Sequence, residues 1–490
     1  MAEEKVSRRT ALKVAVAAIV AGAVAGAGGY ALGTTTAPPA KTITKTITTT
    51  KTITTTPKPT TPTPTTPTPT PAKKEPLIYT GGSWVMFPEV AKEFERRTGR
   101  PVEIHIIPLD IIPQKIIATG GKGWDVGHTA TMHLPPIWAA GITRPIPLEK
   151  VPLFTKENIC EVFVDPKKVL KEDWLVEQWN SALWVDFWKV LYGVPIQITW
   201  DSEIYNPEFL PYTEEGSKKS IEYGEVLNKE WKGHAALQTT AVLACNDMAN
   251  WLVKTGRFKP EVQNDLKPEE VDFVIDFLMP YVKAGQFKAF WGEFGECCTL
   301  MSTREVWITP GWWPACIAIR NAGVPAYYAM LQHGHSFSYS VDFASKYTDK
   351  FEDVCRFMNF RLTEWWTDFI QKKMNYTTPS YVYKKVRPYM GPEHYDWAYM
   401  GKATYKPTEE WFKEMWPEKG EVPKRIADAL FLPGKYKWSM EEGKPHPKGK
   451  IVNMGAIEER NKNISHLMWW AKHADYYVEA WSRLIAAKPA

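Results

Sequence analysis

The sequence predicts an α/β fold in two domains, and three observations carry that prediction. The chain has 490 residues. About 415 of them follow a low-complexity region, and this length exceeds what one small hydrophobic core usually supports. The first segments after that region alternate strand, helix and strand, as a βαβ unit does. The sequence shows neither internal repeats nor a series of short strands, which would indicate an all-β protein.

The first strand and helix have clear local signals. Residues 76–84 form an apolar stretch with a Gly-Gly turn near its end, which is typical of a buried strand. A helix is predicted next, because apolar side chains recur with the spacing of one helical face: Phe87, Val90, Ala91 and Phe94. Gly99 predicts the end of this helix, since glycine accepts the left-handed conformation that often closes one.

Three further segments continue the alternation. Residues 102–107 alternate apolar and polar side chains like a second strand. A third strand begins at Trp124, and the next helix begins within 135–140. The order of these segments predicts the α/β class.

The N-terminus, residues 1–33, has the layout of an export signal. Four basic side chains within the first 13 residues precede an uncharged run of mainly Ala, Val and Gly. Residues 7–13, Ser-Arg-Arg-Thr-Ala-Leu-Lys, resemble the twin-arginine export motif, although Ala11 stands where that motif usually has Phe. The alternative is the positive flank of an ordinary secretion signal.

This segment also has the length of a membrane anchor. The uncharged run of about 20 residues, at about 1.5 Å per residue, spans a bilayer core. The first cysteine is Cys160, so none is present near the run for lipid attachment, and no clear cleavage site follows. We therefore expect residues 1–33 to remain as an uncleaved anchor in the cytoplasmic membrane, with the basic residues inside.

Residues 34–75 consist almost entirely of Thr, Pro, Lys and Ile. A segment without an apolar face cannot form a core, so we expect a disordered, extended stalk. In a polyproline-like conformation, roughly 40 residues reach on the order of 100 Å. This layout predicts a folded part that works outside the cell, tethered at its surface.

The charge of the folded part argues against a nucleic-acid partner. The whole chain carries a net charge of +5, and residues 1–76 contribute +7 through ten Lys or Arg and three Asp or Glu, which leaves −2 for the remainder. No stripe of Lys and Arg is visible in that remainder. The six cysteines permit disulfides outside the cell, but their spacing identifies neither a pairing nor a zinc site.

Six segments in chain order resemble the extracellular solute-binding proteins of ABC importers, and within them the spermidine/putrescine-binding type. The segments are a strand, Gly-rich turn and helix that end at 93–99; 123–126 with 141–148; 192–196 leading to 205–206; 231–233; 302–312; and 350–360 with 376–380. Residues 385–490 have no counterpart in this pattern.

The resemblance implies a periplasmic-binding-protein-like fold, in which two α/β lobes are joined by crossing strands and hold a small solute between them. Lobe one is then expected at 76–196 plus 341–490, and lobe two at 197–340. A protein of this kind is not an enzyme and needs no catalytic group, cofactor or metal. The partner that the resemblance implies is an ABC permease in the membrane.

Positions in the matched segments imply the residues that line the cleft. The turn after the first strand supplies Ser83 and Trp84. The others lie at the end of the third strand, on the crossing strands and after the Pro-Gly turn of lobe two: His128, Thr129, Thr131, Trp200, Asp201, Trp312, Trp313, Phe337, Tyr339 and Asp342. In a chain with 13% aromatic residues, each aromatic position can also belong to the core.

The sequence departs from the polyamine pattern. Polyamine binders hold ammonium groups with carboxylates set among aromatic faces, whereas residues 237–243 contain no acid and Tyr339 stands where an Asp is expected. Asp201 and Asp342 are the acids that remain, which disfavours a di- or triamine. The amide and hydroxyl groups at 238–240 suit a sugar, a thiamine-like ring or a small carboxylate equally well.

Two other functions fit the leader and the stalk. An exported redox enzyme or hydrolase is one, but the sequence has no Gly-x-Ser-x-Gly, His-Glu-x-x-His, Rossmann or Walker pattern. His333 and His335 lack a third nearby ligand, and the adjacent Cys297 and Cys298 lack a neighbouring cation that would stabilise a thiolate. A cell-surface structural protein is the other, and repeats would be expected in it.

Overall fold

The computed structural model describes residues 74–210, 221–402 without 323 and 325, 440–441, 444–445 and 455–489. The predicted anchor at 1–33 and nearly all of the predicted stalk at 34–75 lie outside these residues. Residues 74–490 form a unit of their own, separate from 1–73. Among the described residues, no helix combines the length and the apolar character needed to cross a membrane.

One mixed sheet of 11 strands organises the described residues. Its main path runs, in spatial order, through β10 (Phe287–Trp291), β9 (Ala235–Gln238), β11 (Ile308–Gly311), β8 (Val194–Tyr205), β13 (His335–Ser345), β3 (Val126–Ala130), β1 (Leu77–Gly81) and β2 (Val102–Ile106). Beside this path pair β4 (Thr143–Arg144), β12 (Tyr327–Tyr328) and β16 (Ile464–Leu467). The smaller sheets are formed by β5 (Ile146–Pro147), β7 (Val190–Leu191) and β6 (Trp184–Asp186), and by β14 (Met440–Glu441) and β15 (Lys444–Pro445).

The first elements confirm the predicted α/β class. β1 and β2 pair in parallel, and the helix between them is α2 (Pro88–Thr98). Val90 and Phe94 of this helix are buried, and Gly99 closes it at φ 66°, in the left-handed conformation predicted for it. β3 begins at Val126, slightly later than predicted, and pairs in parallel with the other side of β1.

Two long antiparallel strands, β8 and β13, join the halves of the sheet. They pair with each other over residues 194–201 of β8. β8 then continues beside β11 and β12 over 202–205, while β13 continues beside β3 and β4. We call the strands from β13 to β2 the β1 half, and the strands from β8 to β10 the β9 half. The predicted crossing strands are therefore present.

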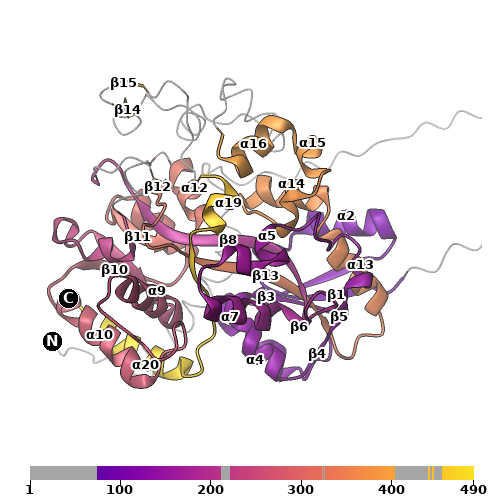
Figure 1. The fold of residues 1–490 in the computed structure, drawn as a ribbon, viewed down its shortest axis with the longest axis horizontal. Coiled ribbons are helices and arrows are strands. Elements are labelled where there is room, and N and C mark those ends of the chain that lie inside the picture. Colours follow the sequence, from indigo (N-terminus) through magenta and orange to yellow (C-terminus); the bar gives the residue numbers. More distant parts are fainter. Residues whose placement is uncertain are drawn as a thin grey trace, which may run out of the picture. The chain divides into compact units, whose positions relative to one another are not determined.

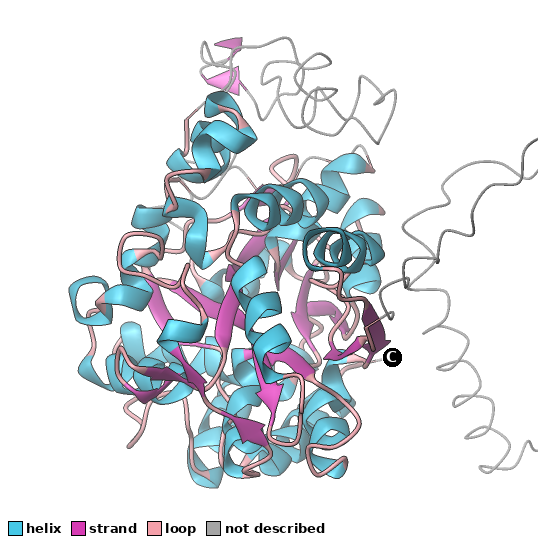
Figure 2. Ribbon diagram, turned by 90° about the vertical axis from the view of Figure 1, so that its right-hand side faces the viewer, coloured by secondary structure: helices cyan, strands magenta, loops and turns pink. Residues whose placement is uncertain are grey.

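Helices lie on both sides of the strands (Figure 2). Those associated with the β1 half, besides α2, are α3 (Ile112–Ala118), α4 (Leu134–Ala139), α5 (Glu161–Val164), α6 (Pro166–Val169), α7 (Asp173–Leu183), α13 (Phe351–Phe360), α14 (Glu364–Met374), α15 (Val386–Met390), α16 (Pro392–Met400) and α19 (Ile457–Asn461). Those associated with the β9 half are α9 (Ala241–Lys254), α10 (Pro268–Lys283), α11 (Phe294–Ser302), α12 (Trp313–Asn321) and α20 (Ala474–Ala486).

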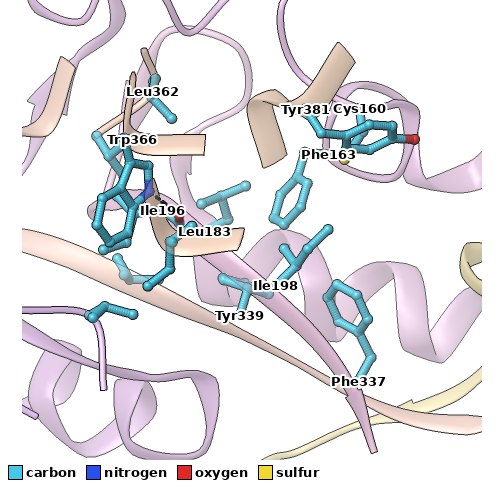
Figure 3. Packing of buried hydrophobic residues seen from close by; sticks show 14 of the residues in the cluster. Cys160, Phe163, Leu183, Ile196, Ile198, Phe337, Tyr339, Leu362, Trp366 and Tyr381 are labelled. Carbon is cyan, nitrogen blue, oxygen red and sulfur yellow. Dashed lines mark hydrogen bonds between the residues drawn. The ribbon is translucent and has the colours of Figure 1, made fainter. Parts of the chain in front are cut away.

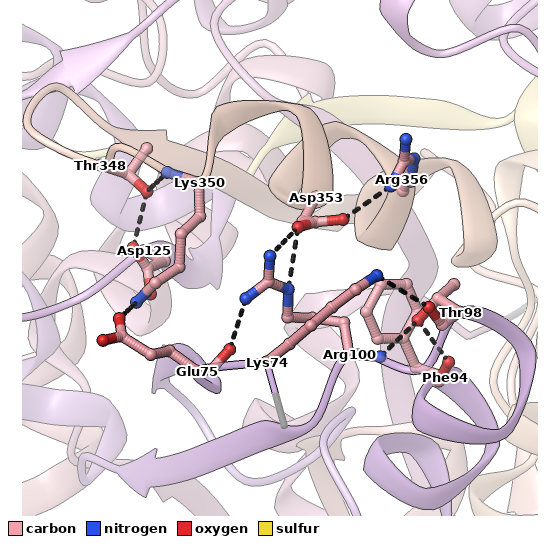
Figure 4. A network of polar contacts seen from close by, with 10 residues as sticks. All are labelled: Lys74, Glu75, Phe94, Thr98, Arg100, Asp125, Thr348, Lys350, Asp353 and Arg356. Atoms are coloured by element: carbon pink, nitrogen blue, oxygen red, sulfur yellow. Dashed lines mark hydrogen bonds and ion pairs between the residues drawn. The ribbon is translucent and has the colours of Figure 1, made fainter. Parts of the chain in front are cut away.

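Polar contacts fasten the first strands to α13. Arg100, which precedes β2, donates from Nε to Asp353 of α13 at 2.8 Å. Lys350 contacts Asp125 at 3.3 Å, and Thr348 donates to the second oxygen of Asp125 at 2.6 Å (Figure 4). Because Asp125 directly precedes β3, these contacts hold the start of that strand against the helix that follows the second crossing strand.

The C-terminal helix, α20, packs in the other half of the sheet from the one that the resemblance implied. The resemblance implied that all of 341–490 belongs to lobe one, but α20 packs against α9 and α10 of the β9 half (Figure 1). Tyr477, Trp481 and Leu484 of α20 are buried in the apolar core of that half. This apolar face is the physical reason, because it would be exposed if the helix did not cover α9 and α10.

Candidate functional site

Polar side chains form a stripe along one face of the crossing strands. The register pairs Ser336 with Asp201, Ser338 with Thr199, and Ser340 with Gln197. Paired residues on neighbouring strands share a face, and so does every second residue of one strand. The six side chains therefore lie together, and we call them the crossing stripe. All are buried except Thr199, which is half-buried.

Two predicted residues of the β1 half reach the crossing stripe. Trp84, from the turn after β1, donates its indole N–H to the Ser340 hydroxyl at 2.9 Å, and Ser340 donates to Gln197 Oε1 at 2.7 Å. Thr131 Oγ1 lies 2.9 Å from Ser338 Oγ. The amide nitrogen of Gln197 is buried without a partner. The stripe thus keeps a hydrogen-bond donor for an additional group.

Asp201 lies where the crossing stripe enters the β9 half. Its side chain is 3% exposed, and neither carboxyl oxygen has a hydrogen-bond partner of regular geometry. Burial raises the pKa of Asp201 well above its usual range, and the nearby charge of Asp247 raises it further, while the indole of Trp312 acts in the opposite direction. A buried carboxyl group without donors is costly, so this position favours a ligand that supplies them.

Two more carboxyl groups accompany Asp201. Glu203 is fully buried, and both of its carboxyl oxygens also lack partners. Burial raises its pKa well above the usual range, and Asp247 and Glu225 raise it further. Asp247 comes from α9; burial raises its pKa, and hydrogen bonds from His466 and Tyr223 lower it. We call Asp201, Glu203 and Asp247 the acidic cluster.

Trp312 and Trp313 stand at the β9 side of the site. The Trp312 ring is half-buried and packs edge-on against Trp291 at 5.2 Å between ring centroids, and it stacks with Phe294 at 6.3 Å. Trp313 packs against Tyr328 at 5.6 Å. Trp312 is therefore the predicted aromatic side chain that the structure brings to the carboxyl group of Asp201.

Three predicted aromatic residues lie on the opposite face of the crossing strands. Trp200 and Phe337 pack 5.6 Å apart, and Tyr339 packs against Phe163 at 5.2 Å. Both Phe337 and Tyr339 also contact Trp179 of α7. Figure 3 shows Phe337 and Tyr339 inside this apolar cluster. The alternation of strand side chains thus places these three residues in the core rather than at the crossing stripe.

His128 and Asp342 form a buried charged group with Arg361. His128 Nδ1 lies 2.8 Å from one oxygen of Asp342, and the Nε of Arg361 lies 3.5 Å from the other. All three side chains are 0% exposed. Burial lowers the pKa of His128, while its hydrogen bond to Asp342 raises it. Asp342 is therefore already paired with a cation of the protein, which leaves Asp201 as the predicted acid without one.

The remaining predicted residues lie near the stripe without joining it. Ser83 is exposed in the turn before Trp84. Thr129 Oγ1 is 2.8 Å from Nδ1 of His133, and both side chains are buried. Gly81, at the end of β1, approaches His128 so closely that a Cβ there would lie 2.3 Å from the carbonyl oxygen of that residue.

Several residues of this site are not among those predicted from the sequence. Within β8 every second residue is polar from Gln197 to Glu203, and Ser336, Ser338 and Ser340 repeat this in β13. That alternation is a signal for a polar face, and it could have identified the crossing stripe. Asp247 has no such signal, because it lies in helix α9 and only the fold brings that helix to β8.

The histidines and cysteines that the sequence analysis considered for metal or redox chemistry lie among the described residues. Within the described residues, no group of three His, Cys, Asp or Glu side chains is placed to hold a metal ion. All six cysteines are among the described residues, and none of them forms a disulfide there. His333 pairs with Glu222, and His335 is buried with its Nε2 3.0 Å from the sulfur of Met330.

Comparisons with known proteins identify the fold. No protein-family model matches the sequence, and no curated protein matches it. A spermidine/putrescine ABC transporter substrate-binding protein from Streptococcus pneumoniae superposes with a TM-score of 0.53 and 13% identity, over 85% of this chain and 100% of the other. A protein described as a spermidine/putrescine ABC transporter from Listeria monocytogenes does so with a TM-score of 0.50 and 15% identity, over 83% of this chain and 98% of the other. The predicted two-lobe α/β fold is thereby confirmed.

Proposed function

We propose that this chain is the solute-binding subunit of an ABC importer and that its solute carries at least one protonated amine. The observation that carries the proposal is Asp201, a buried carboxyl group at the strand crossing whose two oxygens have no hydrogen-bond partner of regular geometry. An ammonium group has three donors and a positive charge. It would satisfy those oxygens and stabilise the ionised form of a carboxyl group that burial otherwise keeps neutral.

The other two acids of the acidic cluster also favour a cationic solute. Asp201, Glu203 and Asp247 bring three carboxyl groups to one end of the crossing stripe, and Trp312 adds an aromatic face beside them. Carboxylates among aromatic faces suit organic cations. The two solved proteins described above, whose names refer to spermidine and putrescine, support the same class of solute. The acids absent from 237–243 are thus replaced by acids from β8 and α9.

The two-lobe fold suits the capture of a solute by closure of the lobes. The lobes that we propose are the β1 half with α2 to α7, α13 to α16 and α19, and the β9 half with α9 to α12 and α20, joined at β8 and β13. Closing the lobes would bury the solute against residues from both, and a membrane permease would recognise the closed form. We further propose that residues 1–33 anchor the protein and that 34–75 hold it away from the membrane, as their composition predicts.

A solute screen tests this function. Purified protein is heated with putrescine, spermidine, a neutral disaccharide or citrate, and we expect a rise in Tm with the amines alone. Calorimetry should then show that Asp201→Asn weakens amine binding at least tenfold, while Asp186→Asn, at an exposed position of β6, leaves it unchanged. Stabilisation by the sugar or by citrate alone would overturn the amine assignment, and chemical conversion of the solute would overturn the assignment as a binding subunit.

A further inference from the structure

The C-terminal segment 457–486 connects the two halves of the sheet a third time. It begins with α19, where Glu458 accepts a hydrogen bond from Tyr381 at 2.7 Å. β16 then pairs in parallel with the start of β13. The segment ends in α20, whose Trp481 donates to the backbone oxygen of Gln238 in β9 at 3.0 Å. It therefore runs directly past the strand crossing.

This path brings His466 to the acidic cluster. His466 is paired with Ser336 in β13, and Ser336 with Asp201 in β8, so the three side chains lie side by side on one face. His466 Nε2 is 2.9 Å from an oxygen of Asp247, and the two side chains are 2% and 5% exposed. Arg460 of the same segment lies over the ring of Trp200, on the opposite face.

The hydrogen bonds around His466 determine how many protons this pair holds. Ser465 donates its hydroxyl hydrogen to the carbonyl oxygen of His335 at 3.0 Å, since a carbonyl can only accept. The same hydroxyl oxygen lies 2.8 Å from Nδ1 of His466, so Nδ1 must be the donor there. One further proton then lies between Nε2 and Asp247. Wherever that proton sits, the pair has no net charge.

We propose that His466 is a specificity-determining residue, which neutralises Asp247 so that the site presents only the charge of Asp201 and Glu203 to the solute. The proposal rests on the proposed function, because it concerns which amine the proposed site prefers. Two uncompensated carboxyl groups match a solute with two ammonium groups better than one with three. His466 lies within residues 385–490, which have no counterpart in the segments that resemble spermidine/putrescine-binding proteins.

Full-length variants separate the charge of His466 from its hydrogen bond. His466→Gln keeps a donor but removes the proton, so Asp247 is left with an uncompensated charge, and the double variant with Asp247→Asn removes that charge. Asp247→Asn alone leaves a neutral histidine whose Nε2 can accept a hydrogen bond from the amide. In unfolding without solute, His466→Gln should therefore be less stable than the double variant, with a coupling of at least tenfold in the unfolding equilibrium constant. Additive effects of the two substitutions would overturn the pairing, whether or not any amine binds.

Calorimetry with putrescine and spermidine tests the effect on specificity. The double variant should keep the wild-type ratio of the two affinities, whereas His466→Gln should shift the ratio roughly tenfold towards spermidine, because it leaves a third charge. If Asp247→Asn weakens putrescine binding as much as Asp201→Asn does, Asp247 itself contacts the amine and the proposal is wrong. A wild-type protein that binds neither amine contradicts the proposed function, while the unfolding cycle still tests the pair.

Discussion

The indole nitrogen of Trp84 lies 2.9 Å from the hydroxyl oxygen of Ser340, although 256 residues separate them in the sequence. Trp84 belongs to the turn after the first strand, and Ser340 to the second crossing strand. Ser340 in turn donates a hydrogen bond to Gln197 of the first crossing strand. One short chain of hydrogen bonds therefore links the turn after β1 to both strands that connect the halves of the sheet.

This contact predicts different results for two substitutions of Trp84. Trp84→Phe removes the donor but keeps a ring against His128, whose ring centroid lies 5.1 Å from that of the indole. We therefore expect a loss of about 1 kcal/mol in unfolding free energy. The amine affinity should stay within about threefold of the wild-type value. Trp84→Ala also removes the ring and should weaken binding roughly tenfold or more. Urea unfolding and calorimetry measure both effects. Trp365→Phe, in α14, is the control, and wild-type affinity in Trp84→Ala would contradict the placement of the site.

Trp312 provides a second test of the site. Trp312→Ala should weaken amine binding by roughly 5- to 30-fold, because it removes the aromatic face beside Asp201. The fold should be retained, since the ring is only half-buried. Trp307→Ala is the matched control: its ring is also half-buried, but it stacks on Phe209 at 4.4 Å, away from the acidic cluster. Equal affinities of the two variants would show that Trp312 is not part of the site.

The sequence predicts the fold of this protein better than it predicts the site. The first strands and helices follow from local patterns, such as the apolar face of 87–94 and the glycine that ends the helix. The face on which a strand residue lies depends on register, so Trp200 and Tyr339 could be placed on a crossing strand but not on its correct face. Asp247 needed the tertiary packing of α9, which no local pattern encodes.

Asp342 is expected to stabilise the fold rather than to bind the solute. Asp342→Asn leaves Arg361 buried and without its charged partner, and breaking a buried ion pair typically costs about 3–5 kcal/mol. Urea unfolding should show a loss of this size, whereas calorimetry on the folded fraction should show nearly unchanged amine affinity. Asp353→Asn is the comparison variant and should cost less, because the side chains of Arg100 and Asp353 are 16% and 11% exposed rather than fully buried. A loss of affinity without a loss of stability would place Asp342 in the site after all.

The acidic cluster should also make stability fall as the pH rises. The pKa values of Asp201 and Glu203 in the folded protein lie well above the ordinary carboxyl range. Between the ordinary value of about 4 and the raised value, the folded state holds protons that the unfolded state has released. The contribution of these groups to stability is therefore full below about pH 4, declines as the pH rises, and levels off only above the raised folded-state pKa values.

Glu203→Gln removes one of these protonation equilibria and keeps the shape of the side chain. In urea unfolding without solute, its unfolding free energy should decline less steeply from pH 5 to pH 8 than that of the wild type, by up to about 1.4 kcal/mol per pH unit. Because histidines titrate in both proteins, the difference between the two curves isolates Glu203. Glu95→Gln, at an exposed position of α2, should parallel the wild type. A wild-type curve parallel to that of Glu203→Gln would mean that Glu203 is already ionised in the folded protein.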